Sequence, residues 1–178
     1  RLGSDERMVI DQCPNWPATH EQADEVMSRT LRWGRRARDR FHALENGRPP
    51  DVLRPTPGQV EFGIGPGGTF KALRDRSVEG TVVLSFDAYA IGGLSVGEPV
   101  DLMYDMVGHT APQLPEHRPR YLMGTGMPDD LVESVARGID LFDCVLPTRN
   151  ARNGQLFTRK GPMNIRNARY AAALDPPH

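Results

Sequence analysis

Short apolar segments that end in glycine or aspartate recur along this chain at nearly even spacing. Three of them end at Gly65, Gly93 and Gly124, which lie 28 and 31 residues apart. That interval fits one strand, one helix and their turns, the repeat of a βα unit. Each segment is apolar enough for a strand covered on both faces, as in a parallel sheet. The predicted strands are residues 8–11, 60–65, 88–93, 121–124 and 141–146.

Segments between these strands have the apolar spacing of helices, at residues 20–44, 70–79 and 128–137. The first begins with a capping box formed by Thr19 and Gln22. Gly80 is predicted to end the second helix, and Pro128 to begin the third. An arginine cluster in the first helix is interpreted as a solvated face; it comprises Arg32, Arg35, Arg36, Arg38 and Arg40. Residues 45–59 are rich in proline and glycine and predict a long surface loop.

The alternation of strands and helices leaves two architectures open, an open doubly wound sheet and a (β/α)8 barrel. Five strands are too few to close a barrel, for which about 250 residues are usual, so a barrel would need residues beyond these 178. In both architectures the active site forms where strands end at their carboxyl side. The residues predicted at such ends are Asp11, Gly65, Gly93, Gly124 and Asp143.

Charge and cysteine content limit the classes of partner. The chain has 22 basic and 23 acidic residues, so nucleic-acid contacts would be confined to a local patch. Cys13 and Cys144 are the only cysteines, too few for a zinc cluster and consistent with the reducing cytoplasm. The histidines lack metal-ligand spacing. No apolar run approaches the roughly 18 residues of a membrane span, and no signal peptide is recognisable. Because the chain begins at Arg1, we interpret it as a fragment or a processed product.

Residues 141–154 are the strongest candidates for chemistry. Asp143 follows an apolar strand and precedes a loop that contains Arg149, Asn150, Arg152 and Asn153. A carboxylate can act as a nucleophile or proton acceptor, while arginine pairs with phosphate and asparagine reads base edges. Two structural alternatives remain. Asp143 can cap a helix or a turn, and Asn153–Gly154 can close a hairpin flanked by residues 155–158 and 164–166.

Asp11 and its neighbours form a second candidate site. Asp11 ends the first strand two residues before Cys13; its carboxylate can accept hydrogen bonds from a guanine-like N–H edge or form an Asx turn. Residues 92–94, Gly-Gly-Leu, either let a ligand approach the backbone or form a tight turn. Met123 suits the core, although its thioether also packs well on a flat ring.

Further motifs occur in order along nearly the whole chain, at residues 3–5, 11–13, 31–33, 91–98, 120–126, 142–154 and 165–168. In this order they closely resemble those of the queuine-type tRNA-guanine transglycosylases. The resemblance implies exchange of guanine at the anticodon wobble position of tRNA for a 7-deazaguanine, a step of queuosine biosynthesis. It also implies a (β/α)8 barrel, with residues 1–178 forming one partial domain, the C-terminal half of the barrel.

By resemblance, Asp143 matches the nucleophile that attacks the ribose anomeric carbon and forms a covalent tRNA intermediate. Asp11 matches the carboxylate that recognises the guanine edge. Gly93 and Leu94 match the backbone segment against the base, and Met123 matches a residue that stacks on it.

The resemblance also covers contacts with tRNA and the choice of base. Arg149 and Arg152 match tRNA contacts beside the scissile nucleotide. Val96 and Cys13 occur in the bacterial branch, whereas eukaryotic catalytic subunits carry a smaller glycine at position 96. The implied incoming base is therefore 7-aminomethyl-7-deazaguanine. The implied partners are a tRNA with guanine at the wobble position and a second copy in a homodimer.

Three departures from the family pattern affect what the chain can do alone. Pro66 stands where a glutamine is expected, and proline has no donor. The family's zinc site, three cysteines and a histidine, would begin just after Pro176, where this chain ends with Pro177 and His178. The partner aspartate that acts as acid and base would precede Arg1. We therefore expect no metal or cofactor in this chain, and zinc in full-length members.

Three functions are compatible with these patterns. The first is a tRNA-guanine transglycosylase or a piece of one. The second is a non-catalytic tRNA-binding or dimerisation fragment of the same family. The third is an unrelated phosphate-binding barrel enzyme, which the paired glycines alone would allow but the ordered series of motifs disfavours.

Overall fold

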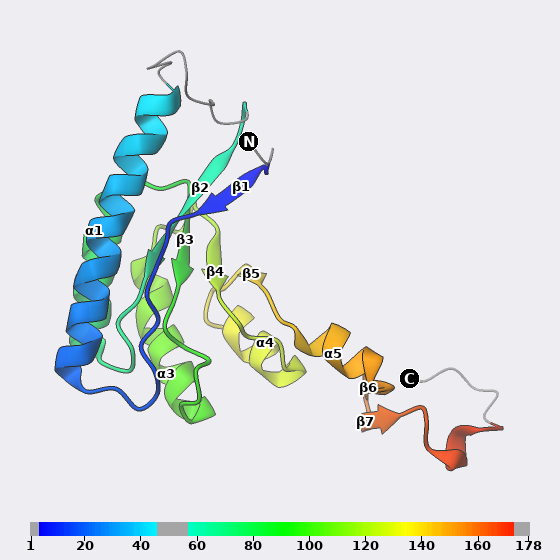
Figure 1. Cartoon of the computed structure of the whole chain (residues 1–178). Helices are drawn as coiled ribbons and strands as arrows, with labels where there is room; N and C mark the ends of the chain where they lie inside the picture. Colours follow the sequence, from blue (N-terminus) through cyan, green and yellow to red (C-terminus); the bar gives the residue numbers. More distant parts are fainter. Residues whose placement is uncertain (1–3, 46–56, 173–178) are drawn as a thin grey trace.

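Five parallel strands form one sheet in the computed structural model, which describes residues 4–45 and 57–172 (Figure 1). They are β1 (Glu6–Met8), β2 (Val60–Gly65), β3 (Ala88–Ile91), β4 (Arg120–Leu122) and β5 (Leu141–Phe142). Each strand pairs in parallel with the next one along the chain. A doubly wound sheet reverses its strand order at a switch point, whereas this order is strictly sequential, as in a barrel. The chain therefore forms half of a (β/α)8 barrel.

Helices alternate with the strands: α1 (His20–Glu45), α2 (Lys71–Val82), α3 (Val100–Thr110), α4 (Pro128–Val135) and α5 (Leu146–Arg152). Two 3-10 turns, Ala111–Gln113 and Ala168–Tyr170, follow α3 and the last hairpin. The predicted capping box of α1 is present, because the Thr19 N–H donates to Gln22 Oε1 at 2.9 Å and the Gln22 N–H to Thr19 Oγ1 at 3.3 Å. Helix α3 was not among the helices that apolar spacing predicted.

Gly80 does not end α2, as the sequence suggested, because the helix continues to Val82. A Cβ atom at Gly80 would lie only 2.9 Å from Leu31 Cδ1 in α1. The glycine is therefore explained by the close approach of two helices rather than by a helix terminus. Its role depends on a neighbour 49 positions earlier in the chain, which local pattern does not reveal.

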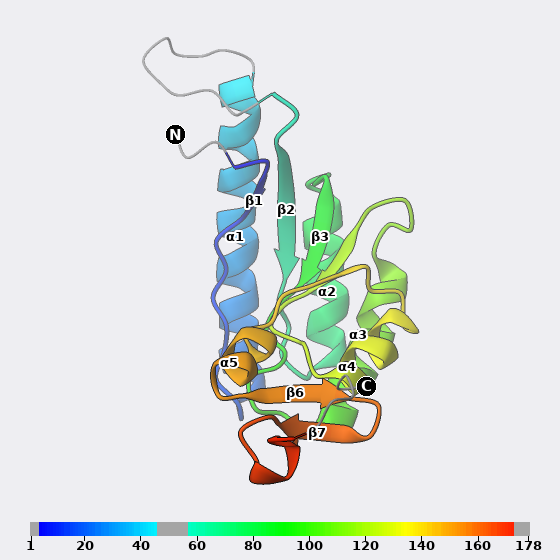
Figure 2. The same cartoon turned by 90° about the vertical axis from the view of Figure 1, so that its right-hand side faces the viewer.

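The segment after β5 also differs from the prediction. Residues 146–152 form helix α5 rather than a loop, with Pro147 in its first turn, where proline is well tolerated. Asn153 and Gly154 end this helix, and Gly154 has a φ of 76°. The hairpin itself joins β6 (Gln155–Thr158) to β7 (Gly161–Asn164), so its turn lies at residues 159–160. Figure 2 shows α5 and this hairpin on the side of the molecule towards which β2 and β3 point.

One arginine of the α1 cluster is buried, which corrects the interpretation of that cluster as a solvated face. Arg38 lies 3.4 Å from both Glu61 Oε2 and Asp87 Oδ2 and donates to the carbonyl oxygens of Leu84 and Ser85. The remaining members are exposed: Arg32, Arg35, Arg36 and Arg40. Most of the predicted loop at 45–59 falls outside the described residues.

Candidate active site

Asp143 directly follows β5 and is held by two groups from β4 and its loop. The Tyr121 hydroxyl donates to Asp143 Oδ1 at 2.6 Å, and the Gly124 N–H donates to the same oxygen at 2.8 Å. The parallel pairing of Leu122 with Phe142 brings these groups together. Among the described residues, Oδ2 has no hydrogen-bond partner, and Asp143 is exposed. The carboxylate is thus oriented through one oxygen while the other is accessible.

Tyr121 is suited to act as a hydrogen-bond donor to this carboxylate. Burial raises the pKa of the Tyr121 hydroxyl, and the hydrogen bond to Asp143 together with its negative charge raises it further. The phenol therefore stays protonated at neutral pH. Its ring also packs edge-on against Phe62 at a centroid distance of 6.2 Å, which restrains the side chain.

Asp11, Gly92 and Met123 meet at the same end of the sheet. A Cβ atom at Gly92 would lie 3.2 Å from Asp11 Oδ2, 3.8 Å from Met123 Sδ and 2.7 Å from a methyl group of Ile64. The missing side chain at Gly92 therefore leaves room for both the carboxylate and the thioether close to the backbone. Burial raises the pKa of Asp11. Strand β1 ends at Met8, earlier than predicted, so Asp11 lies in the loop after the strand.

The loop after β3 is fixed by its own side chains. Glu98 accepts hydrogen bonds from the N–H groups of Ser95, at 2.5 Å, and Val96, at 2.9 Å. Leu94 is buried, while Val96 is partly exposed. Gly93 has a φ of 70°, a conformation that favours glycine. The loop that contains Gly93 and Leu94 is therefore held by its own hydrogen bonds, and Gly92 at its start lies close to Asp11.

Cys13 borders the same loop. Burial of the thiol and the carboxylates of Asp11 and Glu98 raise its pKa, although part of the residue surface is exposed. The raised pKa keeps the thiol neutral at physiological pH. Val96 and Gly93 line a small crevice together with Pro14, Asn15, Trp16 and Gly68.

A hydroxyl pair connects the β3 loop to the loop after β4. Ser95 Oγ and Thr125 Oγ1 are 2.6 Å apart, and Thr125 is buried. Ser95 has a φ of 58°, which is uncommon for a residue with a side chain. Since Gly124 precedes Thr125 and binds Asp143, the pair links the Val96 loop to the loop that orients the carboxylate.

Arg74 is a site residue that the sequence analysis missed. Its guanidinium donates to four carbonyl oxygens in the glycine-rich loops after β2 and β3, those of Gly65, Gly68, Gly92 and Gly93. Burial lowers its pKa to about 10, so it remains charged at neutral pH. The available signal was its place in α2, where Leu73, Ser77, Val78 and Thr81 mark the buried face.

Pro66 lies buried in the loop after β2, opposite Gly93. A Cβ atom at Gly93 would lie 3.8 Å from Pro66 Cβ and 3.5 Å from Pro14 Cδ. The ring therefore fills the space at the position where the resemblance led us to expect a glutamine. Position 66 therefore offers no polar side chain to this end of the sheet.

Arg149 and Arg152 lie on the exposed surface of α5, after the Asp143 loop. Neither forms an ion pair with a carboxylate of the described residues. The Arg152 carbonyl accepts a hydrogen bond from Arg166 Nη2 at 2.9 Å, which ties α5 to the segment after β7. Both guanidinium groups are thus accessible to phosphate, but no hydrogen bond joins either of them to Asp143.

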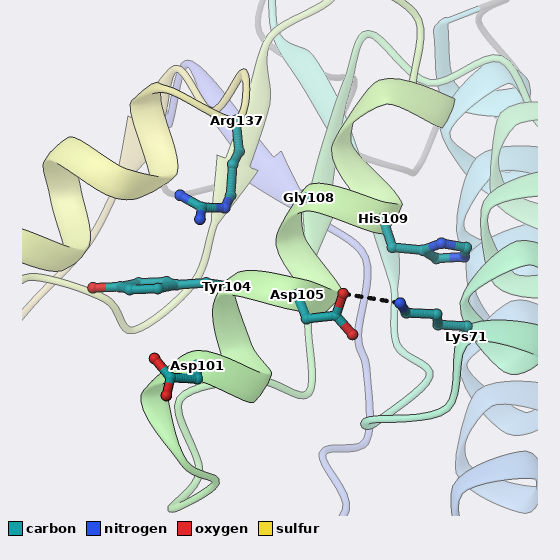
Figure 3. A pocket seen from close by; sticks show the side chains of 7 residues that line it. All are labelled: Lys71, Asp101, Tyr104, Asp105, Gly108, His109 and Arg137. Atoms are coloured by element: carbon teal, nitrogen blue, oxygen red, sulfur yellow. Dashed lines mark hydrogen bonds and ion pairs between the residues drawn. The ribbon is translucent and has the colours of Figure 1, made fainter.

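A separate pocket of about 510 Å³ lies between helices α2, α3 and α4 (Figure 3). Lys71 and Asp105 form an ion pair across it at 2.8 Å, and the Arg137 guanidinium lies 4.9 Å from the centre of the Tyr104 ring. Of its charged residues, Lys71 and Asp105 are therefore paired with each other, while Arg137 and His109 pair with Glu133 and Asp75 outside the lining. None of the predicted site residues lines this pocket.

The described part of the chain does not offer a zinc site. Within residues 4–45 and 57–172, no group of three or more histidine, cysteine, aspartate or glutamate side chains is placed to hold a metal ion. Residues 173–178, beside which the resemblance places the family's zinc ligands, lie outside the described residues. The described helices include none that is long and apolar enough to cross a membrane.

The sequential parallel strands and the oriented Asp143 carboxylate after β5 place the chain in the class of (β/α)8-barrel proteins, with a candidate active site at the strand ends. A family model described as queuine tRNA-ribosyltransferase matches residues 1–178, and the chain belongs to this family. It is 53% identical over 178 residues to the queuine tRNA-ribosyltransferase of Shewanella frigidimarina, covering 98% of this chain and 45% of that protein. The corresponding protein of Vibrio parahaemolyticus is 52% identical over 179 residues, with 99% and 45% covered. The chain thus spans less than half the length of these relatives.

Proposed function

We propose that this chain is the C-terminal half-barrel of a transglycosylase that exchanges guanine at the tRNA wobble position for a 7-deazaguanine. The observation that carries the proposal is the arrangement of Asp143, with one oxygen held by Tyr121 and Gly124 and the other accessible. Family membership supports the same substrate class. The complete activity requires the rest of the barrel, which closes the sheet.

In the proposed reaction, Asp143 Oδ2 attacks the ribose anomeric carbon as the bond from that carbon to guanine breaks. The bonding electrons leave with guanine, which takes up one proton from an acid in the other half of the barrel. The resulting ester holds tRNA on the enzyme. The incoming base then gives its ring N–H proton to the conjugate base of that acid, attacks the same carbon and releases the Asp143 carboxylate.

Base recognition is assigned to the loops around Asp11. The Asp11 carboxylate accepts hydrogen bonds from the base N–H edge, the Gly93–Leu94 backbone lies against the base, and the Met123 thioether stacks on the ring. The proximity of Asp11 Oδ2 and Met123 Sδ to Gly92 supports this assignment.

Choice of base and binding of tRNA are assigned to four other residues. Val96 and Cys13 select 7-aminomethyl-7-deazaguanine over the larger queuine, because their side chains reduce the space beside the ring. Arg149 and Arg152 bind tRNA phosphates from the exposed face of α5. We further propose that the full-length protein is a cytoplasmic homodimer whose zinc is held outside the residues described.

The proposal is tested by grafting this chain into the S. frigidimarina relative in place of its matching segment. Incorporation of radiolabelled guanine into tRNA measures exchange, and a denaturing gel detects the covalent adduct. Asp143→Asn should abolish both, because an amide is a poor nucleophile. Asp129→Asn, at an exposed position in the first turn of α4, is the matched control. Normal exchange by Asp143→Asn would refute the nucleophile. A graft that binds tRNA without exchange would favour a non-catalytic fragment.

A further inference from the structure

Arg74 is a fully buried positive charge that is bound by backbone carbonyl oxygens. Its side chain has no exposed surface, and it donates through Nε to Gly68 O at 2.9 Å, through Nη1 to Gly65 O at 3.0 Å and Gly92 O at 2.8 Å, and through Nη2 to Gly93 O at 3.3 Å. Among the described residues, it forms no ion pair with a carboxylate. A buried charge is unfavourable unless hydrogen bonds compensate for it, so these four carbonyl groups are the compensation.

The bonds to Gly92 and Gly93 also fix where the neighbouring N–H groups point. A peptide group is planar, and in the trans form its C=O and N–H point in opposite directions. Because Arg74 binds the carbonyl oxygens of Gly92 and Gly93, the N–H groups of Gly93 and Leu94 point away from it. The Gly93 N–H lies near the Cys13 sulfur, and the adjoining Gly92 lies close to the Asp11 carboxylate. Within the described residues, neither group donates to a protein oxygen.

The peptide between Gly65 and Pro66 behaves differently. Arg74 binds its carbonyl oxygen as well, but the proline nitrogen carries no hydrogen. The β2 loop therefore presents no donor at this position, either from the backbone or from the proline side chain. Donors at the base site come instead from the β3 loop.

The base carries an acceptor beside its N–H edge. Guanine and its 7-deaza analogues carry a carbonyl oxygen next to the ring N–H and amino groups. If Asp11 accepts from those N–H groups, the neighbouring oxygen requires a donor. The Arg74 charge polarises the peptide groups that it binds, and hydrogen bonds that involve charge strengthen their neighbours.

We propose that Arg74 is a positioning residue that turns the N–H groups of Gly93 and Leu94 towards the base, where they donate to its carbonyl oxygen. The inference rests on the proposed function, since the base is the assumed ligand. Arg74 does not touch the base itself. It acts through two peptide groups, and it also explains how a loop with proline at position 66 retains donors for the carbonyl.

The first test measures binding of guanine and 6-thioguanine to the graft by calorimetry. Both bases carry the same N–H donors, but sulfur is a weaker acceptor than oxygen. The wild-type graft should prefer guanine by roughly fivefold, the worth of one hydrogen bond. Arg74→Met should remove this preference, and Arg74→Lys should partly retain it because the charge remains. Arg76→Met, at an exposed arginine of the same helix that pairs with Asp24, is the control. Equal weakening of both bases by Arg74→Met would overturn the inference.

A second measurement does not depend on any ligand. In the graft, ¹⁵N-labelled selectively at glycine and leucine, Arg74→Met should shift the amide signals of Gly93 and Leu94, because their peptide groups lose the bound charge. The amide of Gly161, in the distant hairpin, serves as the internal reference. Unchanged Gly93 and Leu94 signals would overturn the positioning role. If the wild-type graft binds neither base, the proposed function fails, and the amide signals still decide whether Arg74 orients the two peptides.

Discussion

The Tyr121 hydroxyl donates a 2.6 Å hydrogen bond to Asp143 Oδ1 across the adjoining strands β4 and β5. The strand pairing fixes both backbone positions, and burial of the phenol keeps it protonated. The donor is therefore in place before any substrate binds. The orientation of the carboxylate therefore follows from the pairing of β4 with β5.

Tyr121→Phe should lower kcat for guanine exchange by the graft roughly tenfold, about 1.4 kcal/mol. The carboxylate would keep only the Gly124 N–H and would spend less time in the reactive orientation. Affinity for tRNA should not change, since the Tyr121 hydroxyl contacts Asp143 and the proposed phosphate contacts come from α5. The control is Tyr104→Phe, which removes a hydroxyl that donates to Asp130 at 2.7 Å outside the site. An unaltered kcat in Tyr121→Phe would show that Gly124 alone suffices.

Asp11→Asn should stabilise the chain at neutral pH while it abolishes guanine binding. Burial raises the folded-state pKa of Asp11 above its ordinary value of 3.8. The carboxylate therefore favours folding less as the pH rises from 3.8 through the raised value, and the loss is complete above it. Thermal unfolding of wild type and variant at pH 3 and pH 7 tests the sign. The advantage of the variant should be larger at pH 7; an advantage confined to pH 3 contradicts the prediction.

Pro66→Gln should increase the affinity of the graft for guanine roughly fivefold, by about 1 kcal/mol, through a restored base-edge hydrogen bond. Calorimetric titration with guanine gives the affinity directly. Pro66→Ala separates the effect of the amide from that of removing the ring. If alanine improves binding as much as glutamine, the gain comes from the backbone.

Replacing both Arg149 and Arg152 by alanine should weaken tRNA binding and reduce its salt dependence. Each lost phosphate contact lowers the slope of log K against log salt by about 0.7–0.9. Binding curves at several salt concentrations measure this slope. The paired control is Arg32→Ala with Arg36→Ala, on the exposed face of α1. An equal effect of the control pair would assign tRNA binding to overall charge rather than to α5.

The 178-residue chain alone should self-associate. The open side of its sheet carries an apolar hollow of about 250 Å³ lined by Met8, Phe62, Tyr121, Leu141 and Phe142, with Glu6 at its edge. Exposed apolar surface and unpaired strand edges favour association. Light scattering at increasing protein concentration should show a rising mass. A compact monomer that unfolds cooperatively would contradict this expectation.

Local patterns in the sequence predicted the five strands, three of the helices and the strand end that Asp143 follows, whereas α3 was missed and Asp11 lies in the loop beyond β1. Those features depend on local patterns, since apolar runs, glycines and capping residues act within a few positions. The ordered motifs also determined the family. Even so, local pattern misjudged residues 146–152, because arginine favours helices while asparagine favours caps and turns, so the segment carries conflicting signals.

The roles of Arg74, Arg38 and Gly80 depend on contacts that form only in the folded chain. An arginine is buried when distant backbone carbonyls or carboxylates converge on it, as the loops after β2 and β3 converge on Arg74. Gly80 is required where α1 meets α2. These contacts join separate segments of the chain. They stabilise the protein only once the sheet and helices have packed together. The side chain of Arg74 became recognisable as part of the site for that reason.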